Sequence, residues 1–167
     1  ENSGTEALDS VGIRHATLVG VTESDRVFGR VNRAIQLGGS GEHVTVKGFK
    51  GIGGEKPRSL AMWIKASSSS TSGSLASWGA PGNGLGWNFS IKTGRLSIDV
   101  GGGELTGSTI VNDDAWHHVA LVFPAIGSGV EDIVLYVDGA VENNPINVAQ
   151  AINTGNQFDF KIGTDEN

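Results

Sequence analysis

Acidic residues are the first candidates for chemistry, because two carboxyl groups about 5 Å apart can hydrolyse a glycosidic bond with retention. Glu131 and Asp132 form the one cluster of this kind, and no second acid follows at a spacing that would share its strand face. Glu42, Glu55 and Glu104 stand alone. The Gly-x-Ser-x-Gly elbow is absent, and nothing locates a Ser/His/Asp triad. We therefore predict that the domain is not an enzyme.

The adjacent histidines His117 and His118 raise the question of a metal site. Neighbouring side chains on a strand point to opposite faces, so these two cannot hold one ion together. We expect one ring to pack or hydrogen-bond inside and the other to face outward. His15 and His43 have no ligand partners nearby in the sequence. No histidine is therefore predicted to bind a metal.

Tryptophans are candidates for sugar binding, because the C–H faces of a sugar stack on exposed rings while amides and carboxylates bind its hydroxyls. Trp63 and Trp116 lie within apolar segments, which predicts that they belong to the core. Two others flank the glycine-rich segment 79–86, which could present them at a rim; the alternative is that both cap the core. The carbohydrate site predicted here comprises Trp78, Asn83, Trp87 and Asn88.

Short strand signals separated by turns must position these residues, and this spacing favours an all-β antiparallel sandwich or barrel. In 87–100, apolar and polar residues alternate about a Thr-Gly turn, which predicts a hairpin with one apolar and one polar face. Asp138-Gly139 predicts a second hairpin. Strands are expected at 34–37, 43–46, 59–65, 87–92, 95–100, 116–123, 133–137 and 158–162.

Segments between these strands are expected to be irregular. The polar run 67–74 predicts a flexible loop, and 101–103 is a glycine break. The segment 59–65 is apolar on both faces, which predicts burial on both. Little helix is expected, with one turn near 149–150.

Composition narrows the class of protein. The 167 residues include 26 Gly and no Cys, and 12 basic against 18 acidic residues give a net charge of −6. The length predicts a single domain, 1–167. The absence of Cys excludes disulfides, cysteine-ligated metals and thiol catalysis. The acidic balance argues against nucleic acid as a partner, and no apolar run is long enough for membrane insertion.

Five segments in order resemble the laminin-G-like, concanavalin-A-like jelly rolls found as repeats in bacterial secreted proteins. The most specific is Trp-His-His-Val-Ala within 112–123, followed by Leu-Tyr-Val-Asp-Gly within 133–139. Segments 7–20, 28–39 and 60–65 resemble the family's opening, second motif and core strand. The resemblance implies an antiparallel jelly-roll β-sandwich.

The resemblance also implies a calcium ion at the rim of the sandwich, with Asp9 as the matching carboxylate. The alternative is that Asp9 forms a turn by bonding its own backbone. Asp113 and Asp114 are interpreted as a turn rather than a ligand pair.

Members of this family continue into a final strand of the type Ile-Asp-Asp-Val-Arg-Ile-Tyr, which is not found before Asn167. We therefore expect a jelly roll lacking its final strand and exposing a sheet edge, unless another segment or chain supplies it. The opening at Glu1, without Met, predicts a processed product or an excised piece of a multidomain chain.

These observations predict a non-catalytic recognition module of a larger secreted or cell-surface protein, with a polysaccharide or glycoprotein glycan as its partner. One alternative is a structural or adhesion module that makes protein–protein contacts. A second alternative is a degenerate glycoside hydrolase.

Overall fold

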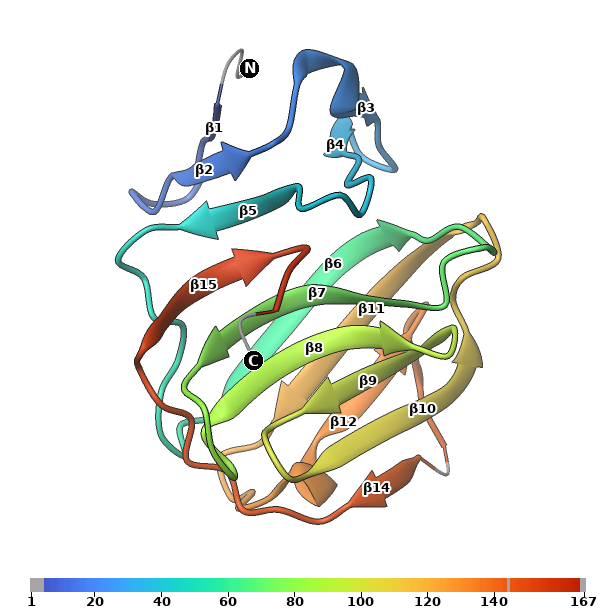
Figure 1. Cartoon of the computed structure of the whole chain (residues 1–167). Coiled ribbons are helices and arrows are strands. Elements are labelled where there is room, and N and C mark those ends of the chain that lie inside the picture. Colours follow the sequence, from blue (N-terminus) through green and yellow to red (C-terminus); the bar gives the residue numbers. More distant parts are fainter. Residues whose placement is uncertain (1–4, 144, 166–167) are drawn as a thin grey trace.

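The computed structural model describes residues 5–143 and 145–165 and shows an antiparallel β-sandwich (Figure 1). Within these residues, the larger sheet has nine strands. Its spatial order is β1 (Glu6–Ala7), β2 (Ala16–Val19), β5 (His43–Val46), β15 (Phe158–Ile162), β7 (Ser72–Gly79), β8 (Gly86–Lys92), β9 (Arg95–Asp99), β10 (Glu104–Ile110) and β14 (Ile146–Val148).

The second sheet lies behind β7–β10 in Figure 1 and has four strands within the described residues. Its order is β13 (Ala140–Val141), β12 (Val134–Val137), β11 (Trp116–Phe123) and β6 (Arg58–Lys65). A separate hairpin joins β3 (Arg26–Phe28) to β4 (Arg33–Ile35). Single 3-10 turns, η1 (Glu23–Asp25) and η2 (Val130–Asp132), are the helical segments of the described chain. No described helix could therefore cross a membrane.

The core lies between the inner faces of the two sheets, where alternate residues of each strand meet. Its fully buried side chains include Trp87, Phe89, Leu96, Ile98, Leu105, Leu121, Phe123 and Leu135. The turn at Thr93-Gly94 and the turn at Asp138-Gly139 have positive φ at both positions, which suits two-residue hairpins. The predicted all-β antiparallel sandwich and both hairpins are confirmed.

Several local expectations were wrong. The polar run 67–74 is not all loop, because β7 begins at Ser72 and pairs with β8. The strand β10 was not expected. Residues 149–150 carry no helical turn, and helix occurs at 23–25 and 130–132 instead. Small polar residues hide a strand from a search for apolar alternation when only one of its faces is packed.

The strand β6 was expected to be buried on both faces, and this was wrong for its outer face. Trp63 is 41% exposed there, so it does not belong to the core. Among the described residues β6 pairs with β11 alone, and Leu60 and Met62 on its inner face are half-buried. Within the described residues β6 is therefore an edge strand of the four-stranded sheet. The final strand, which the resemblance implies would pair near the N-terminal strand, stays a prediction.

Candidate functional site

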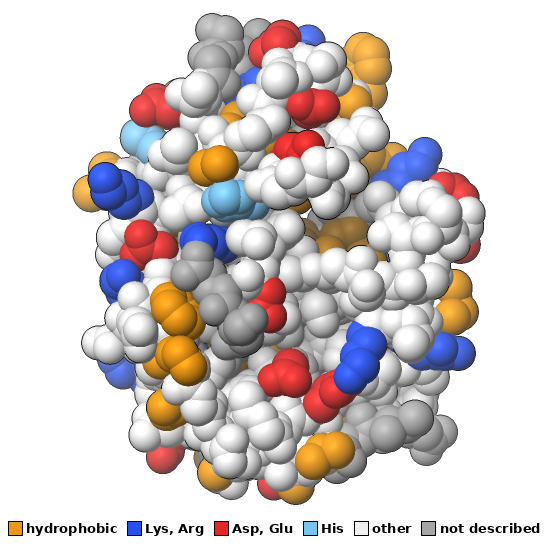
Figure 2. All heavy atoms as spheres, viewed as in Figure 1, with side chains coloured by type: hydrophobic (Ala, Val, Ile, Leu, Met, Phe, Trp, Pro, Cys, Tyr) orange, Lys and Arg blue, Asp and Glu red, His pale blue; other side chains and the backbone are white. Residues whose placement is uncertain are grey.

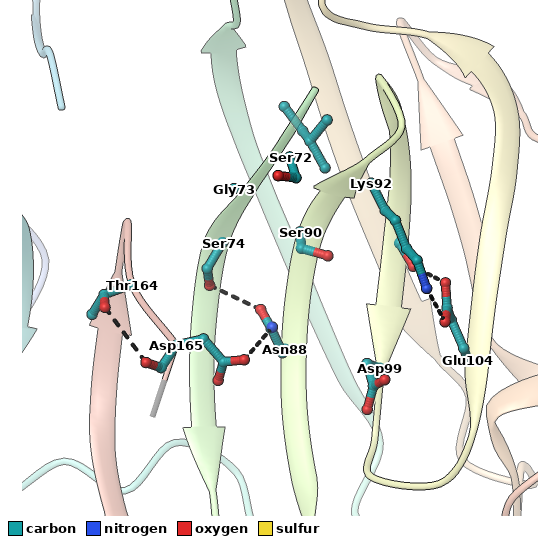
Figure 3. A pocket seen from close by; sticks show the side chains of 12 residues that line it. Ser72, Gly73, Ser74, Asn88, Ser90, Lys92, Asp99, Glu104, Thr164 and Asp165 are labelled. Atoms are coloured by element: carbon teal, nitrogen blue, oxygen red, sulfur yellow. Dashed lines mark hydrogen bonds and ion pairs between the residues drawn. The ribbon is translucent and has the colours of Figure 1, made fainter. Parts of the chain in front are cut away.

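A polar groove of about 320 Å³ lies on the outer face of β7–β10 (Figure 3). Strand alternation creates it. On β8, Trp87, Phe89 and Ile91 point into the core, while Asn88, Ser90 and Lys92 alternate with them on the other face. We call this site the polar groove; it is lined by Ser72, Gly73, Ser74, Asn88, Ser90, Ile91, Lys92, Ser97, Asp99, Glu104, Thr164 and Asp165.

The register of three strands aligns hydrogen-bonding side chains across the groove. Asn88 on β8 lies opposite Asp99 on β9, and Asp99 lies opposite Glu104 on β10. Directly opposed residues on one face of antiparallel strands have neighbouring side chains. Figure 2 shows acidic side chains near the middle of this otherwise largely uncharged face. The groove therefore presents a row of amide and carboxylate groups.

Glu104 is held in its charged form by its neighbours. Its carboxylate accepts hydrogen bonds from Lys92 Nζ at 2.5 Å, Thr106 Oγ1 at 2.8 Å and Ser97 Oγ at 3.1 Å. Burial opposes ionisation, but these three donors together hold the pKa of Glu104 below its usual value. Glu104 is therefore an ionised, rigidly placed acceptor.

Asn88 is fixed from the opposite side of the groove. Ser74 Oγ donates to Asn88 Oδ1 at 2.8 Å, and Asn88 Nδ2 donates to Asp165 Oδ2 at 2.7 Å. The segment after β15 is anchored nearby, since Ser77 Oγ donates to the Thr164 carbonyl oxygen at 2.7 Å. The amide is thus oriented before any ligand arrives, as Figure 3 shows.

Asp99 completes the row and shapes the end of β9. Its Oδ1 accepts the backbone N–H of Gly101 at 2.7 Å, which ties the carboxylate to the turn that follows. The opposing positions of Asp99 and Glu104 bring two acids together that are five residues apart in the sequence. A search for clustered acids along the chain misses this pair.

The two tryptophans of the predicted carbohydrate site lie in the core. Trp87 is fully buried and Trp78 is 6% exposed. Their rings stack at 5.4 Å, and Trp78 Nε1 donates to the Ile52 carbonyl oxygen at 3.2 Å. The expectation that a loop presents these rings to a sugar was wrong, because both face the interior beneath the groove. The alternative, that both cap the core, is confirmed.

The two asparagines of that predicted site are not brought together. Asn88 lines the polar groove, whereas Asn83 lies in the exposed β7–β8 loop outside it. The groove-lining serines and acids were not singled out from the sequence. The polar face of the predicted 87–100 hairpin was the signal that could have found them.

Asp9 forms a turn with its own backbone, as one of the two interpretations predicted. Its carboxylate accepts the N–H groups of Val11, Gly12 and Arg14 at 2.9–3.1 Å, which lowers the pKa of Asp9. Asp9 and Arg14 line a second pocket, separate from the polar groove, and the positive charge of Arg14 there disfavours binding of a calcium ion. The described residues contain no cluster of three metal-binding side chains. Calcium binding at Asp9 stays a prediction. It is tested by the melting temperature, which should rise with added calcium and fall with chelator if the ion binds.

The two adjacent histidines have separate surroundings. His117 lies between two turns: Nδ1 is 2.8 Å from Asp138 Oδ2, and Nε2 is 3.0 Å from Asp113 Oδ1. The His118 ring instead packs against Trp63, with centroids 5.3 Å apart. We call the first arrangement the His117 clamp. It connects the turn before β11 to the β12–β13 turn, and so brings the Trp-His-His and Val-Asp-Gly segments into contact.

The fold is an antiparallel β-sandwich, and the polar groove lies on the outer face of its larger sheet. The family model Laminin_G_3, described as the concanavalin A-like lectin/glucanases superfamily, matches residues 38–167. The chain therefore belongs to this family, as its motifs indicated. No curated protein matches the chain.

Proposed function

We propose that the domain is a non-catalytic recognition module that binds glycan in the polar groove, within a larger secreted or surface protein. The observation that carries the proposal is the preoriented row of Asn88, Asp99 and Glu104 across three strands. Fixed amide and carboxylate groups suit sugar hydroxyls, which both donate and accept hydrogen bonds. Membership of a superfamily that includes lectins supports it.

The charge state of the groove supports binding rather than hydrolysis. A glycosidase needs a carboxylic acid whose pKa is raised so that it can protonate the leaving oxygen. Glu104 has the opposite property, since its three hydrogen-bond donors keep its pKa low. The groove therefore lacks a prepared general acid at Glu104, which disfavours the degenerate-hydrolase alternative.

Sugar binding here would rest on hydrogen bonds rather than ring stacking. The residues that line the groove include no aromatic side chain. Exchange of water for sugar hydroxyls has a small net free energy for each hydrogen bond. We therefore expect dissociation constants in the micromolar to millimolar range for short oligosaccharides, with longer chains binding more tightly by contacting more of the groove.

The test is retention on a polysaccharide panel, followed by calorimetry with oligosaccharides of any retained polymer. Asn88→Ala should weaken binding about tenfold or more, while the matched control Asn83→Ala, an exposed asparagine outside the groove, should bind as wild type. Equal binding by the two variants would contradict a site in the groove. Product release from the polymer would contradict the non-catalytic assignment.

A specific observation favours the adhesion alternative as a second candidate. The outer face of the four-stranded sheet carries Trp63 and Val141, which are 41% and 48% exposed. Exposed apolar side chains that share one face are typical of protein contacts. This candidate predicts no glycan retention and a protein partner whose binding is lost in Trp63→Ala but kept in Asn88→Ala.

A further inference from the structure

We infer that the polar groove selects uncharged glycans and discriminates against acidic ones such as uronic-acid polymers. The inference rests on the proposed glycan-binding function and adds the substrate class. It follows from the distribution of charge among the residues that line the groove, two of which, Asp99 and Glu104, also belong to the hydrogen-bonding row.

The groove carries an excess of negative charge. Among the described residues, three carboxylates line it, namely Asp99, Glu104 and Asp165, against one ammonium group, Lys92. The residual charge of the lining residues is therefore −2. The whole chain has the same sign, at −6. A carboxylate on a sugar ring would enter a field that repels it.

The one cation in the groove lining is already neutralised. Lys92 Nζ lies 2.5 Å from Glu104 Oε2, and Ser97 and Thr106 hold the same carboxylate in place. A sugar carboxylate that approached Lys92 would also approach the carboxylate of Glu104, because the two protein groups are in contact. The two carboxylates repel each other, which offsets the attraction to Lys92.

Two neighbouring cations, Arg95 on β9 and Lys50 in the segment after β5, are engaged elsewhere. Arg95 donates to the carbonyl oxygens of Ser108 and Thr93. Lys50 lies 2.8 Å from Asp159. Neither cation lines the groove. Lys161 lies on β15 opposite Ser77 of β7, and it does not line the groove either. Among the described residues, the charge of the groove lining is therefore set by Asp99, Glu104, Asp165 and Lys92.

Hydrogen-bond polarity acts in the same direction. The carboxylates of Asp99 and Glu104 accept hydrogen bonds and cannot donate them. A sugar hydroxymethyl group can donate to such an acceptor, whereas a sugar carboxylate at the same position only accepts. Oxidation of the ligand at C6 thus replaces a favourable contact with a repulsive one. We expect acidic oligosaccharides to bind at least about tenfold more weakly than their neutral counterparts at low salt.

The experiment uses pairs of hexasaccharides that differ only at C6: β-1,4-mannohexaose with β-1,4-mannuronate hexamer, and cellohexaose with its C6-oxidised form. The neutral member of at least one pair should bind, and its acidic counterpart should bind at least about tenfold more weakly. Asp99→Asn, which keeps the size of the side chain, should reduce this ratio severalfold. Glu131→Gln makes the same change in net charge outside the groove and should leave the ratio unchanged.

The outcomes separate the two levels of the proposal. If no hexasaccharide of either charge binds, glycan recognition in the groove is refuted together with the selectivity. Equal binding of neutral and acidic members overturns the selectivity alone. A preference that Asp99→Asn and Glu131→Gln reduce equally would assign it to the net charge of the chain rather than to the groove, which also overturns it.

Discussion

The four-stranded sheet and the outer face of the nine-stranded sheet differ in whether their sequences contain recognisable family motifs. The first contains Trp-His-His-Val-Ala and Leu-Tyr-Val-Asp-Gly, the most recognisable segments of the chain. The second is built from serines, an asparagine and scattered acids. Yet the recognisable residues pair strands and connect turns, while the plain ones form the open groove. A recurrent motif here marks architecture, because register and turn geometry tolerate few alternatives.

The largest expected effect on stability comes from truncating a core side chain beneath the groove. Trp87 is fully buried against Trp78, with the Arg58 guanidinium 4.3 Å from its ring centroid. Trp87→Ala should lower the free energy of unfolding by about 3–5 kcal/mol, because it leaves a cavity between the sheets. Urea denaturation measures this loss. A loss below 1 kcal/mol would contradict the core position of this ring and revive a surface role.

Arg58 on β6 packs against Trp87 on β8 and so connects the two sheets across the core. Its substitution should give the next largest effect on stability. Its guanidinium is buried and donates to the carbonyl oxygens of Ile52 and Gly54 and to Thr154 Oγ1. Burial lowers the pKa of Arg58 to about 10, so the group stays charged at neutral pH. Arg58→Met should cost about 2–4 kcal/mol, because the buried acceptors lose their donor. Denaturation with urea at pH 7 measures it, and Arg58→Lys should recover part of the loss.

The sequence predicted the sandwich better than it predicted the site, and particular residues show why. Alternation in 87–100 places Trp87 inside and Asn88 outside without knowledge of any other strand. Trp63 was misplaced because its segment is apolar on both faces, and only the arrangement of sheets decides which face is covered. Glu104 seemed isolated because its neighbour Asp99 is set by the register across a glycine loop. Alternation within one segment specifies which side chains share a face of the strand. Which residues form a site depends on how the strands pair with one another.

The His117 clamp makes the motif-rich region sensitive to pH. Each ring nitrogen of His117 is within hydrogen-bonding distance of a carboxylate oxygen. Both nitrogens can donate a hydrogen bond at the same time only when the ring is protonated. Burial opposes the charge, but the hydrogen bonds to Asp138 and Asp113 outweigh it and raise the pKa of His117 above its ordinary value of 6.5. The backbone N–H of Ala115 and then the contact with His117 lower the pKa of Asp113 below 3.8. The contact with His117 and then the backbone N–H of His118 lower the pKa of Asp138 below 3.8, and burial has a smaller, opposite effect on both.

The sign of the pH dependence follows from these directions. A raised histidine pKa stabilises the fold fully below about pH 6.5, and the contribution is lost as pH rises through the folded-state value. The aspartates contribute above their ordinary value of 3.8 and lose the contribution as pH falls through their depressed values. The clamp is therefore strongest near pH 5–6. Between pH 6 and pH 8.5 the wild type should lose stability that His117→Gln does not lose.

Unfolding free energies of both proteins at the two pH values measure this difference. His43→Gln is the matched control, because the one hydrogen bond of the His43 ring among the described residues is to the Gly41 carbonyl oxygen rather than to a carboxylate. It should keep the wild-type pH dependence. If His117→Gln and His43→Gln showed the same dependence, the clamp would not be the origin of the effect.

The smallest expected effect on stability comes from a groove residue, and it distinguishes the groove most sharply from the core beneath it. Asn88 follows Trp87 directly and points outward, where water can replace its bonds to Ser74 and Asp165. Asn88→Ala should change the unfolding free energy by less than about 1 kcal/mol, as expected for a partly exposed polar side chain, while weakening glycan binding about tenfold. Two adjacent residues of β8 would thus have different roles: Trp87 would stabilise the fold, and Asn88 would bind the glycan. A variant that lost both together would show that the groove row is part of the architecture, because binding would then fail through the fold rather than through the missing amide.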